Sequence, residues 1–230
     1  MNWDQIVQRH YPNAVTCTQV AEENLNYIEQ ELGGDRRTTL LASSRCADDL
    51  VATNQTLNQE FDGPFHLGGL AGFPFTGKTG MTAYANHIHE GGTAFILYGP
   101  HIGIAADGSI GNMLRPGQSR CTSTCGALVG AVTQIESGRA PASEYDDFQQ
   151  PQIIKMLSPY QGRIFSASAP IQEATQICYE LIHEQINQIL DATINEFSCK
   201  RIVLVGGILI NTDVGAEDYM TVENSEYIDL

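Results

Sequence analysis

Cys46, His87 and Cys125 are the residues of this chain whose side chains are best suited to bind a metal ion. Two thiolates and one imidazole bind zinc well, and three protein ligands leave the fourth tetrahedral position open for water, as in catalytic zinc sites. Asp48, two residues after Cys46, could order that water or compete with it. The spacing alone is weak support, because the three residues are far apart and no compact C-x-x-C pair is present.

The local context of the two cysteines strengthens the case for a metal site. Cys46 follows a short apolar run at 38–42 that predicts a buried strand, and ligands of open α/β sheets gather at the carboxyl ends of strands. Cys125 opens a helical run, where the helix dipole lowers the pKa of a thiol and favours the thiolate that a metal needs. Cys121, four residues earlier, is an alternative ligand.

Strands that alternate with helices indicate an α/β fold with a mostly parallel central sheet flanked by helices. We expect one domain over 1–230, with residues 1–34 as a helical N-terminal layer. The predicted helices lie at 48–61, 81–86, 126–132 and 170–197, the strands at 38–42, 93–98, 201–205 and 208–211, a hairpin at 102–109, and a polar linker at 139–151.

Composition limits the possible partners. The chain has 230 residues and is 42% hydrophobic, which is enough apolar content for a core. Its formal net charge of −15 repels nucleic acid and anionic membranes. No run of 18 apolar residues predicts a membrane span, and the N-terminus has no secretory signal pattern. Six scattered cysteines do not predict a disulfide framework. We therefore expect a cytoplasmic protein, or one in an organelle stroma if a transit peptide was removed.

Residues 72–79 match the phosphate-binding pattern G-x-x-x-x-G-K-[ST]. That motif needs a buried strand running into its first glycine, but glycines interrupt the preceding stretch. No apolar run ends in the aspartate that would hold magnesium, and Phe73 and Phe75 would crowd the phosphates. A P-loop nucleotide enzyme is therefore only the second alternative, and we interpret Lys78 as a solvated loop charge.

Several motifs, in order along the chain, resemble those of the limiting-CO2-inducible protein B family, the LCIB-like or theta-type carbonic anhydrases. The likeness covers about residues 40 to 215. The matching segments are Cys46-Ala47-Asp48-Asp49, residues 68–75, Thr79-Gly80, His87-Ile88, Gly91-Gly92, residues 99–103, Asp107-Gly108, Gly111, Cys125-Gly126, residues 205–208 and Ile210-Asn211.

The resemblance implies a fold similar to that of β-class carbonic anhydrases and a zinc ion held by Cys46, His87 and Cys125. It also implies reversible hydration of carbon dioxide to bicarbonate, as in a CO2-concentrating mechanism, and a homodimer. An acidic residue paired with an arginine is part of the pattern, and it maps onto Asp48. The corresponding pattern of the β class is C-x-D-x-R, but the position of its arginine is occupied here by Leu50.

The nearest arginines are Arg45, Arg115 and Arg120, and we assign Arg45 to the catalytic set with Asp48. In such a site a zinc ion would supply a nucleophilic hydroxide for attack on carbon dioxide, and Asp48 would accept a hydrogen bond from that hydroxide. Carbon dioxide needs an apolar wall, which Leu70, Phe73 and Phe75 could form.

Proton transfer needs a carrier, and His89 or His101 has a suitable intrinsic pKa, although both are more simply read as surface or turn residues. His66 could support the site or pack a loop. The main alternative function is a non-catalytic zinc protein that binds or regulates inorganic carbon. An arginine in contact with Asp48 would favour the enzyme.

Overall fold

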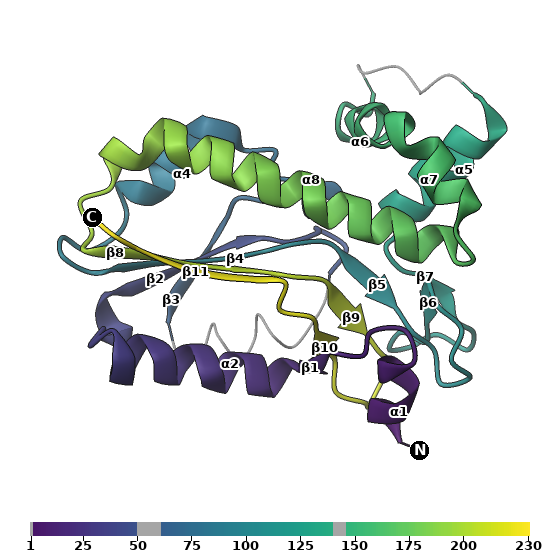
Figure 1. The fold of residues 1–230 in the computed structure, drawn as a ribbon, viewed down its shortest axis with the longest axis horizontal. Helices are drawn as coiled ribbons and strands as arrows, with labels where there is room; N and C mark the ends of the chain where they lie inside the picture. Colours follow the sequence, from purple (N-terminus) through teal and green to yellow (C-terminus); the bar gives the residue numbers. More distant parts are fainter. Residues whose placement is uncertain (1, 50–60, 140–145) are drawn as a thin grey trace.

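The computed structural model describes residues 2–49, 61–139 and 146–230 (Figure 1). Most of the helix predicted at 48–61, and part of the linker predicted at 139–151, lie outside the described residues. The single-domain expectation for 1–230 stays a prediction.

A five-stranded sheet forms the centre of the fold, in the order β11-β8-β4-β2-β3. Strands β3, β2, β4 and β8 are parallel, and β11 pairs antiparallel with β8 at one edge. The strands are β2 (Thr39–Ser44), β3 (Asp62–His66), β4 (Thr93–Tyr98), β8 (Arg201–Gly206) and β11 (Asn224–Asp229). The sheet is therefore mostly parallel, as the alternation of strands and helices predicts.

The three central parallel strands end at the same level. Ser44 of β2 pairs with Tyr98 of β4, and Tyr98 pairs with Gly206 of β8. Residues that follow these three strands by a few positions therefore start from one edge of the sheet, which is where ligand sites of open α/β sheets form.

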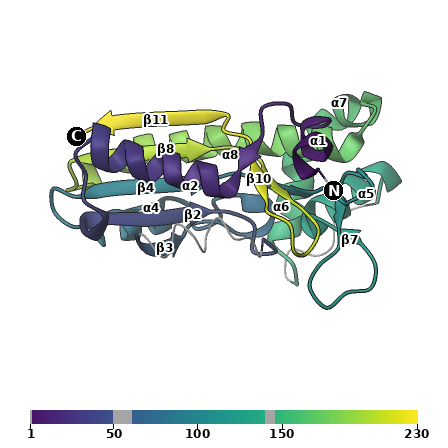
Figure 2. The same cartoon turned by 90° about the horizontal axis from the view of Figure 1, so that it is seen from below.

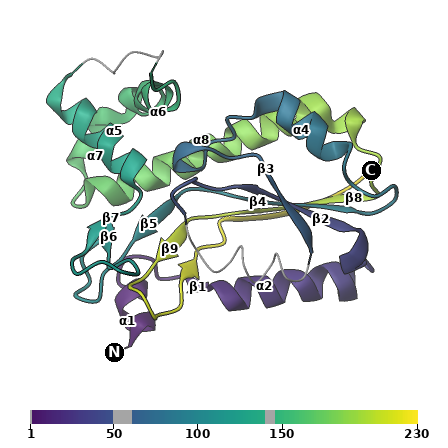
Figure 3. The ribbon, with the colours of Figure 1, turned by 180° about the vertical axis from the view of Figure 1, so that it is seen from behind.

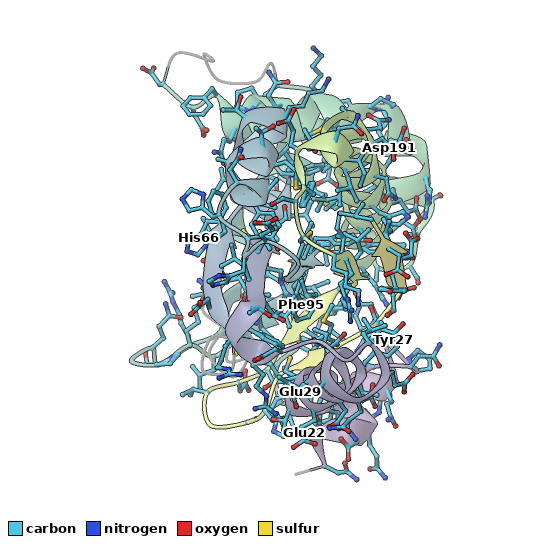
Figure 4. All side chains as sticks on the ribbon, turned by 90° about the vertical axis from the view of Figure 1, so that its left-hand side faces the viewer. Glu22, Tyr27, Glu29, His66, Phe95 and Asp191 are labelled. Carbon is cyan, nitrogen blue, oxygen red and sulfur yellow. The ribbon has the colours of Figure 1, made fainter. Side chains whose placement is uncertain are left out.

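Helices cover both faces of this sheet: α4 (Gly77–Ala85) and α8 (Pro170–Thr193) lie on one face, and α2 (Cys17–Asn26) lies on the other (Figures 1 and 3). Along β4, Ile96 belongs to the apolar cluster under α4 and α8, whereas Phe95 belongs to the cluster that includes α2. Figure 4 shows Phe95 in the interior, with Asp191 of α8 and Glu22 of α2 on opposite sides of it. A strand buried on both faces is apolar throughout, as the sequence 93–98 is.

The remaining elements form the ends of the molecule. Strands β1, β10, β9 and β5 make a second small sheet, and α5, α6 and α7 gather beside one end of α8 (Figure 1). Their bounds are α1 (Trp3–Gln8), β1 (Val15–Thr16), β5 (His101–Gly103), β6 (Asn112–Met113), β7 (Thr122–Ser123), α5 (Gly126–Ser137), α6 (Gln149–Leu157), α7 (Gln161–Ser166), β9 (Leu209–Asn211) and β10 (Tyr219–Met220). Short helical turns lie at Tyr27–Glu31, Arg36–Thr38, Leu70–Gly72, Ser158–Tyr160 and Ile194–Glu196.

The strands predicted at 38–42, 93–98, 201–205 and 208–211 and the long helix from 170 all occur close to their predicted bounds. The strand at 93–98 has the predicted bounds, and the helix predicted from 170 runs to Thr193 before a short helical turn. The N-terminal layer contains α1 and α2, separated by β1.

The hairpin predicted at 102–109 is confirmed as a chain reversal but not as a pair of strands, because the N–H of Ala105 donates to the carbonyl oxygen of Ser109 at 3.0 Å and that of Gly111 to the carbonyl oxygen of Gly103 at 2.7 Å. β5 instead pairs in parallel with β9, and only an isolated bridge joins Ile104 to Ile110. Strand β9, the partner of β5, lies about a hundred residues later in the chain, so no local pattern predicts that pairing.

Candidate metal and acid–base site

The edge where the central strands end brings two metal-binding side chains together. Cys46 lies two residues after the end of β2, and His101 lies three residues after the end of β4. Because β2 and β4 pair in register up to Ser44 and Tyr98, both residues lie beyond the same sheet edge. Figure 3 shows β5, which begins at His101, continuing from this edge beside β9.

Cys125 completes the group from the N-terminus of α5, where it is the capping residue. Its Sγ lies 3.4 Å from Sγ of Cys46. Potential ligand atoms of Cys46, His101 and Cys125 all lie within 4.8 Å of one another, and all three residues are buried. One ion with ligand bonds of about 2.0–2.3 Å can span such a group. The structure thus contains a Cys-His-Cys group that can hold a metal ion.

His101 is held in the orientation that metal binding requires. Its Nδ1 donates to Oδ1 of Asn211 at 2.7 Å, and Asn211 is the last residue of β9. The other ring nitrogen, Nε2, is buried and has no hydrogen-bond partner among the described residues. Metal-binding histidines usually donate their second ring N–H to a protein oxygen, which fixes the tautomer. The free Nε2 of this tautomer is the nitrogen that fits a metal.

The backbone near residue 71 supplies a hydrogen bond to the first sulfur. Ala71 adopts a left-handed conformation with φ of 55°, and its N–H donates to Sγ of Cys46 at 3.1 Å. The next residue must be glycine, because Gly72 has φ of 88° and a Cβ there would lie 2.4 Å from the carbonyl oxygen of Gly99. This close approach packs the 70–73 turn against the loop that leads to His101.

The electrostatics of the group depend on its close packing. The contact with Cys125, together with burial, raises the pKa of the Cys46 thiol well above its usual range. Burial would lower the pKa of His101, but the neighbouring Cys46 and the charge of Asp49 outweigh it and raise that pKa. Since metal ligands must be deprotonated, a cation bound to the group would replace the proton of the Cys46 thiol.

The structure corrects the choice of His87 as the histidine of this group. His87 follows α4, is exposed, and its Nδ1 lies 2.7 Å from the carbonyl oxygen of Ala83. It precedes β4, whereas His101 follows β4. The two histidines therefore belong to opposite ends of that strand, and Cys46 lies beyond the end that His101 follows.

Asp48 is paired with Arg115. Nη2 of Arg115 donates to Oδ2 of Asp48 at 3.2 Å and also to Oγ1 of Thr124 at 3.2 Å. The backbone N–H of Gly126 donates to the same Oδ2 at 3.2 Å. Asp48 is therefore held beside Cys125, the residue before Gly126, by one guanidinium and one amide.

Arg45, which we assigned to Asp48 from the sequence, pairs instead with Asp49. Their Nη2 and Oδ2 atoms lie 3.3 Å apart, and their side chains are 3% and 1% exposed. Both residues line a cavity of about 290 Å³ that also borders Cys46, Ala47, Ser43, Gly68 and the exposed His66. The assignment fails because consecutive aspartates, 48 and 49, reach different arginines.

The proposed apolar wall is only partly beside the group. Phe73 is fully buried in the core and its ring centroid lies 5.8 Å from that of Phe75. Leu70 is partly buried and precedes Ala71, which contacts Cys46. None of the three residues is among the described residues that line the cavity next to Cys46.

Cys121 and His89 are exposed, and neither belongs to the Cys-His-Cys group. Lys78 is exposed on the first turn of α4. Residues 70–72, immediately before the phosphate-loop match, form a short helical turn rather than a strand. The match at 72–79 therefore lacks the strand that the motif requires.

The sequence pattern did not place His101 in the Cys-His-Cys group, since it was interpreted as a proton carrier or as a surface or turn residue, and it did not indicate Asn211. A signal for His101 was present, because the rule that places Cys46 after a strand applies equally to a histidine after the strand 93–98. No local signal marks Arg115 over the other arginines.

Comparison with known proteins identifies the family. The model of the family described as limiting CO2-inducible proteins B/C beta carbonic anhydrases matches residues 14–229, and the chain belongs to this family.

Solved structures show the same fold. The structure of PtLCIB4, a homolog of the limiting CO2-inducible protein LCIB, has a TM-score of 0.89 at 29% identity and covers 98% of this chain and 95% of its own. A histidine-to-alanine variant of PtLCIB4 has a TM-score of 0.89 at 30% identity, with 98% and 93% covered. LCIB itself matches with a TM-score of 0.66 at 15% identity, covering 96% of each chain, which supports the fold alone. No curated protein matches the chain.

In the described part of the chain, no helix is both long enough and apolar enough to cross a membrane.

Proposed function

We propose that this protein is a zinc-dependent carbonic anhydrase, a lyase that catalyses reversible hydration of carbon dioxide to bicarbonate. The observation that carries the proposal is the buried Cys46–His101–Cys125 group beside an Asp48 that an arginine holds. Zinc is the proposed metal because two thiolates and one imidazole are typical zinc ligands and leave one position open. A zinc ion bound there would act as a Lewis acid that makes water a nucleophile near neutral pH.

The protein's own residues then position the reaction. The hydrogen bonds from Arg115 and Gly126 both fall on Oδ2 of Asp48, so among the described residues Oδ1 has no donor and can accept a hydrogen bond from the nucleophile. Arg115 also opposes the movement of the carboxylate onto the metal, because it offers a competing positive charge. Asp48 thus orients the nucleophile, and Asn211 keeps Nε2 of His101 toward the metal.

The cavity beside Cys46 supports a place for the substrate. We assign Arg45 to this cavity, with Asp49, rather than to Asp48. The apolar turn at Leu70 and the neighbouring Phe75 remain the proposed wall for carbon dioxide, while the full burial of Phe73 fits a core role better.

Stopped-flow measurement of carbon dioxide hydration, together with metal analysis, tests the proposal. The zinc-loaded protein should hydrate carbon dioxide, and Cys46→Ala and His101→Ala should lose bound zinc and rate together. His87→Ala is the matched control, because that histidine is exposed at the opposite end of β4 from His101. This variant should keep both its bound zinc and its hydration rate. Zinc that binds without any rate above the uncatalysed reaction would instead favour a non-catalytic zinc protein that binds or regulates inorganic carbon.

We also propose a homodimer, and a cytoplasmic or stromal location, on the basis of the family and the composition. Light scattering on the protein as it elutes from a size-exclusion column should give twice the chain mass of 25.1 kDa. A monomer at micromolar concentration would refute the dimer.

A further inference from the structure

The segment that follows β9 reaches two parts of the site. Asn211 ends β9 and accepts from Nδ1 of His101. Two residues later, Asp213 accepts from the backbone N–H of Leu114 at 2.6 Å through Oδ1, and from that of Ala106 at 2.9 Å through Oδ2. The N–H of Val214 donates to the carbonyl oxygen of Leu114 at 2.8 Å. Leu114 is therefore held at both its amide and its carbonyl group.

Leu114 matters because it directly precedes Arg115, the partner of Asp48. The short ladder of β6 and β7 pairs Met113 with Thr122 and goes no further, so the ladder does not hold Arg115. Residues 116–121 are all exposed, and the loop between β6 and β7 projects from the body of the protein (Figure 2). Arg115 thus lies at the start of an exposed loop, just beyond the β6–β7 pairing. Asp213 and Val214 fix the backbone of the preceding residue, Leu114.

We propose that Asp213 is a positioning residue: it clamps Leu114, so that the guanidinium of Arg115 stays on Oδ2 of Asp48. The inference rests on the proposed function for its kinetic part only. A carboxylate suits the task because its two oxygens accept from two separate segments at once. In Asp213→Asn one of these oxygens becomes an NH2 group, which cannot accept and faces a backbone donor.

A double-mutant cycle separates positioning from general stability. In zinc-loaded protein, Asp213→Asn should lower kcat for carbon dioxide hydration about 10-fold, without loss of zinc. This is the lower end of the effect of residues that hold the groups around a metal in place. In an Arg115→Ala background the same substitution should have almost no further effect, because residues that act through one another are not additive. Equal losses in both backgrounds would overturn the proposal in favour of a purely structural turn.

Asp107→Asn is the control, since Asp107 lies between β5 and β6, next to Ala106, but accepts hydrogen bonds from Ser109, including its N–H at 2.8 Å, and not from Leu114. It should leave kcat unchanged.

A second measurement does not depend on catalysis. The side-chain N–H signals of Arg115 in ¹⁵N NMR spectra, assigned by their absence in Arg115→Ala, should shift or broaden in Asp213→Asn and stay unchanged in Asp107→Asn. Unmoved signals in Asp213→Asn would refute the clamp. A wild-type protein without hydration activity would refute the proposed function and leave this result to decide the clamp.

Discussion

At the scale of single residues, the consecutive aspartates Asp48 and Asp49 form ion pairs with different arginines. Asp48 meets Arg115 at a partly exposed position, whereas Asp49 meets Arg45 in the interior. An exposed ion pair contributes little to stability, but removal of one partner of a buried pair leaves an uncompensated charge. The same residue types therefore have the proposed catalytic role in one pair and a structural role in the other.

Arginine-to-alanine substitutions should separate these roles. Arg115→Ala should lower kcat for carbon dioxide hydration by about 100-fold, the lower range for general acid–base groups, with a stability change of at most about 1 kcal/mol. Arg45→Ala should lower the free energy of unfolding by about 3–5 kcal/mol. Kinetics and urea unfolding of both variants measure the two effects. A large stability loss in Arg115→Ala, with little loss of rate, would contradict the assignment.

At the scale of elements, the connection between β9 and β10 contains a buried carboxyl group that makes the stability of the fold depend on pH. Asp218 precedes β10 and accepts from the N–H of Thr212 at 2.7 Å. Burial raises the pKa of Asp218 to about 6, assisted by the charge of Asp49 and opposed by the hydrogen bonds from Thr212 and the charge of Arg45. The folded protein thus holds this proton at pH values where the unfolded chain has released it.

The stability of the wild-type protein should therefore fall, relative to Asp218→Asn, as the pH rises from about 4 to about 6. A carboxylic acid with a raised folded-state pKa favours folding below its unfolded pKa and loses that advantage as it ionises. The complete shift corresponds to about 3 kcal/mol, of which about 2 kcal/mol falls between pH 4 and pH 6. Urea unfolding of both proteins at pH 4, 5, 6 and 7 measures it. A constant difference between them at all pH values would show that Asp218 does not titrate in this range.

At the scale of the whole molecule, the Cys-His-Cys group joins distant parts of the chain. Cys46 follows β2, His101 begins β5, and Cys125 caps α5. An ion bound to all three would connect the sheet edge to the helices beside α8. Because an unfolded chain does not hold these residues together, binding energy adds to folding stability.

Removal of the metal should therefore lower the melting temperature. At a free zinc concentration about 1,000 times Kd, the expected stabilisation is about 4 kcal/mol. Thermal unfolding with and without a chelator tests this in wild-type protein, His101→Ala and His87→Ala. Wild type and His87→Ala should respond to the chelator and His101→Ala should not. A chelator response in His101→Ala equal to that of wild type would mean that the stabilising ion binds elsewhere.

The sequence alone determined the α/β class, the strand at 93–98, the long helix from 170, the family resemblance and the two cysteines of the metal group. These features follow from local periodicity, from strand ends and helix starts, and from motifs, all of which are written in contiguous residues.

Only the tertiary structure decided which histidine joins the cysteines and which arginine meets Asp48. His101 reaches Cys46 because β2 and β4 pair in register, and Arg115 reaches Asp48 because β6 and the start of α5 meet there. Strand register and the contacts of long loops depend on residues far apart in the chain, so no local pattern contains them.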